Sequence, residues 1–87
     1  MAVFMVERDL KGITMEQLAA AQRRAIESSN DFKKDGRAVR YIRTTFVPGE
    51  ERSMCLFEAH AANDVKEVNE TAQIPFVRIV EALDLTP

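Results

Sequence analysis

The stretch RAVRYIRTTFVPGEERSMCLFEAH, Arg37–His60, contains two segments rich in β-branched and aromatic residues. Pro48-Gly49 between them is a strong turn signal, because proline and glycine favour the backbone angles that a tight turn needs. We therefore expect strands over Arg37–Val47 and Glu51–His60, joined as a β-hairpin. The fold class then depends on what lies on either side of this hairpin.

The chain before the hairpin predicts one strand followed by one helix. Ala2–Arg8, AVFMVER, is a short apolar run of the kind that forms strands. Thr14 and Gln17 have the spacing of a capping box, with Thr at the N-cap and Gln at the third helical position. Strong helix formers follow, so we expect a helix over Met15–Ser29 and then a loop that ends at Gly36.

The chain after the hairpin predicts a second helix and a last strand. Asn63 or Asp64 is the expected N-cap, since short polar side chains accept hydrogen bonds from the first helical amides. Apolar residues at helical spacing mark the inner face of this helix: Val65, Val68 and Ala72. Pro75 ends the helix at or before Ile74, and Phe76–Leu83 is the last strand.

The resulting order, β-α-β-β-α-β, is that of the ferredoxin-like α+β fold, an antiparallel four-stranded sheet with both helices on one face. Residues 1–87 form a single domain without linker or repeat. Alternation along the strands also places apolar residues on the face that the helices leave open: Val3, Met5, Met54, Leu56, Val77 and Ile79. Because a sheet face in water is normally polar, we expect a homodimer that packs two such faces together.

Composition and charge limit the classes of function. The chain has 87 residues, of which 46% are hydrophobic, and a formal net charge of −2. This charge disfavours nucleic acid as a partner, and the lack of a long apolar run argues against a membrane-spanning segment. The N-terminal MAVFMVERDL lacks the basic start of a signal peptide, and a single cysteine cannot form an internal disulfide. We therefore expect a cytoplasmic protein.

The segment SMCLFEAH holds the only cysteine and the only histidine of the chain. Alternation places Cys55 on the face that the helices cover, where a lone cysteine acts as a small hydrophobic residue. The same alternation places His60 on the open face. The two residues are therefore not expected to bind one metal ion together.

A weak cluster remains at the rim of the open face. Glu58 and His60 end one strand, and Glu81 is expected to reach the same end on a neighbouring strand. A histidine with two carboxylates can bind a divalent metal ion or act as an acid–base pair. The alternative is that both carboxylates only form ion pairs with arginines, Arg40 or Arg78.

Two further polar residues are candidates for ligand contacts. Tyr41, with Arg40 and Arg43 nearby, can line a pocket for an acidic or aromatic ligand; otherwise it is half-buried packing with its hydroxyl at the edge. Asn69 lies near the apolar face of the second helix, where its amide can bond a ligand or a backbone carbonyl. The sequence contains no phosphate loop, HExxH, CxxC or nucleophile-elbow pattern.

Four motifs in order, FMVERDLKGIT, VRYIRTTFVP, CLFEA and VxEVNETAQIP, resemble a family of small bacterial proteins known chiefly as a domain of unknown function with a ferredoxin-like fold. The resemblance covers almost the whole chain. One branch of that family is described as nickel-binding and dimeric, with histidines where the first strand ends and in the second helix. The corresponding positions here are Glu7, Arg8 and Asn69. A carboxylate can bind nickel and an amide binds it weakly, whereas a guanidinium has no lone pair to offer.

A looser resemblance links the chain to muconolactone-isomerase-like proteins. The shared features are the strand order, the small size and the Pro75-Phe76 junction that enters the last strand. This resemblance implies a pocket between helices and sheet at an oligomer interface. It carries no site residue, because it is one of topology alone.

Three functional hypotheses follow. The first is a protein that binds a small ligand or a metal ion at or near a homodimer interface, and its candidate contacts are Glu7, Tyr41, Glu58, His60 and Asn69. The second is a dimeric α/β-barrel enzyme of isomerase or monooxygenase type, in which His60 or Glu58 moves a proton and Arg40 or Arg43 holds a small organic acid. The third is a structural or interaction module whose partner is a second copy of itself.

Overall fold

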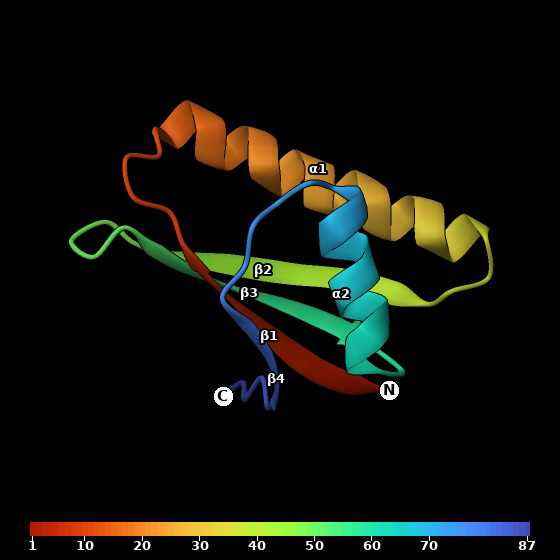
Figure 1. Ribbon diagram of the computed structural model, residues 1–87. Coiled ribbons are helices and arrows are strands. Elements are labelled where there is room, and N and C mark those ends of the chain that lie inside the picture. The colour runs from red at the N-terminus through yellow and green to blue at the C-terminus, as the bar shows by residue number, and fades with distance from the viewer.

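The computed structural model describes residues 1–87 and confirms the ferredoxin-like order of elements (Figure 1). In chain order these are β1 (Ala2–Asp9), α1 (Met15–Lys34), β2 (Val39–Val47), β3 (Arg52–Ala59), α2 (Ala62–Thr71) and β4 (Arg78–Ala82). The four strands form one sheet in the order β2-β3-β1-β4, and each neighbouring pair is antiparallel. Both helices lie on the same side of the sheet (Figure 1).

The core lies between the helices and the sheet. The alternate residues of β1 and β3 that point toward the helices are buried, among them Val6 and Phe57, which are both 0% exposed. The predicted inner face of α2 meets them, since Val65 and Val68 are also fully buried. Cys55 belongs to this core, as alternation predicted. The sequence pattern therefore gave the correct facing of both central strands.

Helix α1 is longer than the sequence predicted. The capping box at its start is present, with reciprocal hydrogen bonds between Thr14 and Gln17. The expected loop, however, is helical to Lys34, and Phe32 in this extension packs against the core. The helix ends where Gly36 adopts a left-handed backbone angle, φ +85°, which glycine tolerates without steric cost.

Helix α2 begins earlier than the sequence predicted. Its N-cap is Ala61, which makes no side-chain capping bond, and neither Asn63 nor Asp64 takes that role. The carboxylate of Asp64 instead accepts a hydrogen bond of 2.7 Å from Arg37, in the connection between α1 and β2. A long-range ion pair thus replaces the local capping bond, which sequence spacing alone does not reveal.

The facing of β4 differs from the prediction. Ile79 pairs with Val6 and Glu81 pairs with Phe4, so both lie on the side that the helices cover. Val80 lies on the open side instead. The prediction was wrong because Ile79 and Val80 are adjacent apolar residues, and alternation cannot say which of them points inward.

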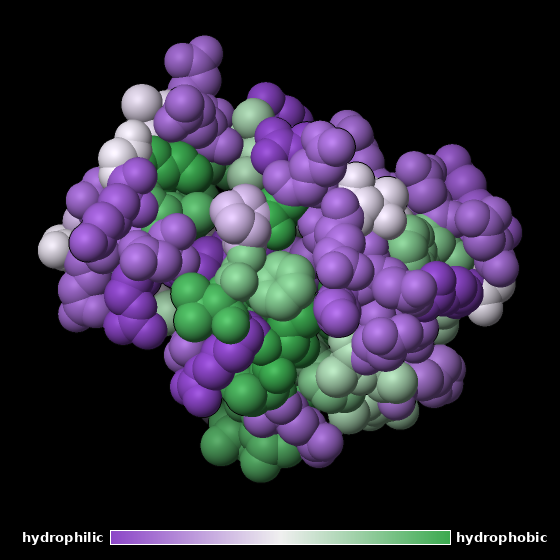
Figure 2. All heavy atoms as spheres, in the orientation of Figure 1, coloured by the Kyte–Doolittle hydropathy of each residue, from purple (hydrophilic) through white to green (hydrophobic).

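The open face of the sheet is less bare than expected. Its apolar side chains are half-buried: Val3, Met5, Met54, Leu56 and Val80. The segment after β4 reaches across this face, because Asp84 accepts a hydrogen bond of 3.0 Å from Arg43 on the far edge strand. Leu83 and Leu85 of this segment are 79% and 84% exposed. Figure 2 shows apolar atoms gathered in the lower part of the molecule, where Figure 1 places β4 and the C-terminal end.

Neither helix has the length and apolar character that crossing a bilayer requires.

Candidate functional site

The predicted cluster at the rim of the open face does not form. Glu58 lies opposite Val3 at the expected end of the sheet, but its carboxylate pairs with Arg40 at 3.3 Å. His60 is exposed in the bend after β3, and Glu81 lies on the other face. No three His, Cys, Asp or Glu side chains stand close enough to share a metal ion. Of the alternative, the ion pair of Glu58 with Arg40 is confirmed, whereas Arg78 pairs with Glu7 and not with Glu81.

Glu7 lies at the opposite end of the open face and is held by arginines. Its two carboxylate oxygens accept hydrogen bonds of 2.6 and 3.2 Å from Arg78, and Arg52 lies 3.8 Å away. The Arg78 guanidinium lowers the pKa of the Glu7 carboxyl below its ordinary value. Arg78 is the first residue of β4 and stands directly opposite Glu7 of β1, so the ion pair joins cross-strand neighbours.

Asn69 and Arg8 meet inside the protein. Asn69 is 0% exposed, and its amide donates a hydrogen bond of 2.8 Å to the carbonyl of Val65 one turn earlier in α2. Its side-chain oxygen accepts a hydrogen bond from Arg8, which is 3% exposed and also donates to the carbonyl of Pro75 at 3.0 Å. Of the two contacts considered for Asn69, with a ligand or with a backbone carbonyl, the structure shows the second.

These positions do not suit nickel. Arg8 and Asn69 occupy two of the positions where the nickel-binding branch is expected to carry histidines, and they bond to each other. Both polar atoms of the Asn69 amide are already used, and a guanidinium cannot coordinate a metal ion. Glu7 is on the opposite face of the sheet and belongs to the ion pair with Arg78. The residues present therefore form a polar structural contact, not a set of metal ligands.

Tyr41 faces the helices, away from Arg40 and Arg43. Its ring packs edge-on against Phe57, with ring centres 5.5 Å apart. Its hydroxyl accepts a hydrogen bond of 2.9 Å from Gln22 of α1 and shares another with Thr44. Arg40 and Arg43 lie on the open face, paired with Glu58 and Asp84. The pocket predicted from Tyr41 and these two arginines is therefore not formed.

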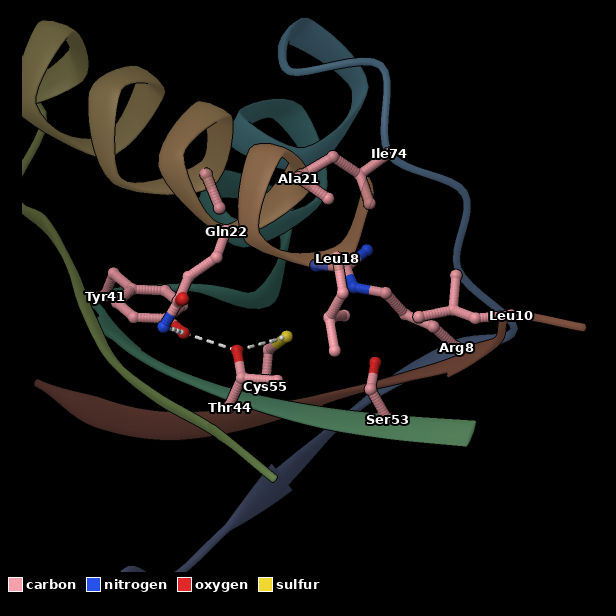
Figure 3. A pocket seen from close by; sticks show the side chains of 11 residues that line it. Arg8, Leu10, Leu18, Ala21, Gln22, Tyr41, Thr44, Ser53, Cys55 and Ile74 are labelled. Carbon is pink, nitrogen blue, oxygen red and sulfur yellow. Dashed lines mark hydrogen bonds between the residues drawn. The ribbon is translucent and has the colours of Figure 1, made fainter. Parts of the chain in front are cut away.

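Tyr41 does line a small internal cavity between α1 and the sheet (Figure 3). The cavity has a volume of about 20 Å³ and is also lined by Arg8, Ser53 and Cys55. The Cys55 thiol lies 3.1 Å from the hydroxyl of Thr44. The Thr44 hydroxyl shares a hydrogen bond with the Tyr41 hydroxyl, which accepts another from Gln22 at the surface. Neither His60 nor Glu58 lines this space, so the acid–base residues of the predicted enzyme are not assembled here.

Ser53 is a polar residue of this cavity that the sequence analysis did not single out. It is 1% exposed, and its hydroxyl is the one buried side-chain polar atom without a hydrogen-bond partner. Figure 3 shows this hydroxyl pointing up from β3 into the space below α1. The signal in the sequence was its parity with Cys55 and Phe57, which places a serine on a core face.

A surface groove adjoins the cavity. It has a volume of about 580 Å³ and lies between the loop after β1, the first turns of α1 and the segment before β4. Leu10, Ala21 and Ile74 line both spaces, so the cavity and the groove lie on either side of these residues. Figure 2 shows an apolar patch ringed by hydrophilic atoms beside the loop that follows β1 in Figure 1.

Comparisons with known proteins identify relatives but no activity. The model of the family described as "Nickel responsive protein SCO4226-like" matches residues 4–82. Among solved structures, the crystal structure of SCO4226 from Streptomyces coelicolor A3(2) matches with a TM-score of 0.81 and 26% sequence identity, over 98% of this chain and 100% of that chain. None of the curated protein sequences matches. The two matches confirm the resemblance that the four sequence motifs indicated.

Proposed function

This chain belongs to the SCO4226-like family of nickel responsive proteins, and we propose that it is a binding protein that takes a small ligand into the cavity beneath α1. The observation that carries the proposal is the buried Ser53 hydroxyl without a partner, at a cavity that shares three lining residues with an open groove. Buried polar groups are nearly always hydrogen-bonded, so an unpartnered one beside a cavity favours a bound molecule. A cytoplasmic location is part of the proposal, since the one cysteine has no disulfide partner.

The groove has the size expected of a small-molecule site. Pockets that bind small molecules have volumes of roughly 300–1,000 Å³ and are mostly apolar with a few polar groups. The groove, at about 580 Å³, lies within this range, and half of its lining residues are hydrophobic. The ligand therefore occupies the groove and reaches the polar groups of the cavity.

A ligand that occupies both spaces passes the three residues that line both of them, Leu10, Ala21 and Ile74, and this gives a direct test. The backbone amide signals of the protein are followed by NMR while a set of neutral, cationic and anionic small molecules is added. At least one compound is expected to shift the signals of Ser53, Cys55 and Leu10. Ala21→Leu narrows the passage and should abolish these shifts, whereas Ala19→Leu, at an exposed position of the same helix, should not. If no compound shifts these signals, the proposal is wrong.

The family description raises the question of nickel, and a small ligand is preferred to a metal ion here. The contact between Arg8 and Asn69 leaves no ligands at the expected histidine positions. Added nickel should therefore leave the melting temperature of the protein unchanged. A nickel-dependent rise that His60→Ala removes would instead support a metal site at the Glu58 end of the open face.

A homodimer through the open face is the second part of the proposal. Its support is the half-buried apolar row on that face, continued by the exposed Leu83 and Leu85. Apolar surface of this extent favours association with a second copy. Light scattering should give about twice the 9.8 kDa of one chain, and Leu56→Asp should give the monomer mass. Ala19→Asp, on the outer face of α1, serves as the control. A single-chain mass at all concentrations would contradict the dimer.

A further inference from the structure

The buried charge of Arg8 has no carboxylate to balance it. The side chain is 3% exposed, and its two hydrogen bonds go to neutral acceptors, the Asn69 amide and the Pro75 carbonyl. The last turn of α2 contributes partial negative charge at this place, which offsets only part of a full positive charge. A buried guanidinium without a counter-charge is costly, because the protein interior solvates ions poorly. The unbalanced charge of Arg8 therefore favours the binding of an anion beside it.

The cavity beside Arg8 accepts one oxygen atom. Its volume of about 20 Å³ is that of roughly one water-sized group. Ser53 supplies a hydroxyl donor that has no other partner. Figure 3 shows Arg8 reaching in from β1 and Ser53 pointing up from β3 below it, with the Leu18 side chain beside them. An oxygen that carries negative charge is the acceptor to which a guanidinium and a hydroxyl donate most strongly.

The groove outside the cavity also carries positive charge, which suits an anionic ligand. Lys11 and Arg24 are among the residues that line it, whereas none of the residues that line the cavity or the groove is acidic. The chain as a whole carries 14 acidic and 12 basic residues. The cavity and the groove together are thus lined by three cationic side chains and no carboxylate, although acidic residues outnumber basic ones in the whole chain. This local excess of positive charge favours an anionic ligand. Glu51 does not line the groove, although its carboxylate accepts a hydrogen bond of 2.7 Å from the amide of Gly12, which does.

We propose that the ligand is an aliphatic monocarboxylate whose carboxylate meets Arg8 and Ser53 while its apolar tail lies in the groove. This inference rests on the proposed function and names the ligand class of the same site. A carboxylate is preferred because its oxygens accept the charge-assisted hydrogen bonds that a guanidinium and a hydroxyl donate. One oxygen fills the cavity, and the tail passes between Leu10 and Ile74 to the apolar residues of the groove.

The test compares hexanoate with hexanamide, which has nearly the same shape and no charge. Isothermal titration calorimetry of the intact protein should show hexanoate binding at least about tenfold more tightly, because one charge-assisted contact is worth about a factor of ten or more. NMR titration with hexanoate should shift the backbone signals of Arg8 and Ser53. Arg8→Met should remove the preference for hexanoate, whereas Arg23→Met, an exposed arginine of α1, should retain it.

Each outcome has a distinct meaning. If hexanamide binds as tightly as hexanoate, the proposed ligand class is wrong, but the proposed binding site is supported. If neither binds and no other compound shifts the Ser53 signal, the proposed function fails as well. If Arg8→Met does not fold, Ser53→Ala takes its place and should weaken hexanoate about tenfold by losing a hydrogen bond to a charged group. A crystal structure with a single water bonded to Ser53 in the presence of saturating hexanoate would overturn the inference.

Discussion

The polar residues on the two faces of the sheet differ in their exposure to water. On the covered face, Arg8 and Ser53 are at most 3% exposed, as is Asn69 of α2, which bonds to Arg8, so water cannot replace a missing hydrogen bond. On the open face, the arginines of the ion pairs are about half exposed, with Arg40 at 51% and Arg78 at 58%. An exposed ion pair contributes little to stability, whereas a buried polar group without its partner is costly. Functional polar groups are therefore to be sought on the covered face.

The largest expected difference is between two neighbouring residues of β3, Phe57 and Leu56. Phe57 is 0% exposed beneath the helices, whereas Leu56 is half-buried on the open face. Phe57→Ala should lower the free energy of unfolding by about 3–5 kcal/mol, because it removes a large buried ring and leaves a cavity. Leu56→Ala should cost only about 1 kcal/mol, since less surface is buried there.

Urea unfolding of dilute protein measures both changes, and dilution matters because a dimer would bury Leu56. An equal cost of the two substitutions at low concentration would show that the open face is packed as tightly as the covered one. In that case the C-terminal segment, or a tightly bound second copy, contributes more than the contacts of one chain indicate.

The next effect concerns the buried contact between Arg8 and Asn69. Asn69→Leu keeps the side-chain size and removes the acceptor of a buried guanidinium, so it should cost about 2–3 kcal/mol. In the double variant with Arg8→Met, both polar partners are gone. The double variant should therefore be less destabilised than the sum of the single variants. Additive costs in urea unfolding would mean that the two residues contribute independently, against the contact described.

The general fold was predictable because local signals agreed with one another. The capping box of Thr14 and Gln17 and the hairpin turn at Pro48-Gly49 are set by residues close in sequence. Three details were not predictable, and each depends on distant residues. The facing of Ile79 is fixed by pairing with β1, the cap of α2 is changed by the ion pair of Asp64 with Arg37, and the length of α1 is set by its contacts with the core.

The candidate site was predictable only in part. Alternation predicted the burial of Cys55. The position of Asn69 near the apolar face of α2 indicated a contact with a ligand or a backbone carbonyl, and the carbonyl contact is the one formed. Arg8 shares its parity with Val6, so an arginine on the core side was visible in the sequence. The cavity was not, because its volume depends on how Leu18 and Ile74 pack above Ser53. Side-chain packing across elements leaves no local sequence signal.

A smaller effect, of opposite sign, is expected at Ser53. Ser53→Ala removes a buried hydroxyl that has no partner, so the protein without ligand should become more stable by about 1 kcal/mol. Thermal and urea unfolding measure this gain. Ser29→Ala is the matched control, because its hydroxyl does have a partner in the carbonyl of Ala25 and its loss should destabilise. A loss of stability in Ser53→Ala without ligand would show that the hydroxyl is already satisfied by a bound water.

The smallest effect belongs to the open face and depends on pH. Arg78 holds the pKa of Glu7 below its ordinary value of 4.5, so the folded protein keeps this carboxylate ionised more readily than the unfolded chain. Its contribution to stability is therefore complete above that ordinary value and disappears as the pH falls through the lowered one. Glu7→Gln should be slightly less stable than the natural protein at neutral pH, and the difference should shrink on acidification.

Urea unfolding midpoints from neutral pH down to about pH 3 test this prediction, because the two curves should converge on the acidic side. Glu27→Gln, at an exposed position of α1, should show no such convergence. High salt should reduce the difference at neutral pH, since exposed charges are screened. If the difference persists unchanged at low pH and in high salt, Glu7 acts through packing and not through its charge. The open face would then resemble the covered one, and the contrast between the two faces would fail at its weakest point.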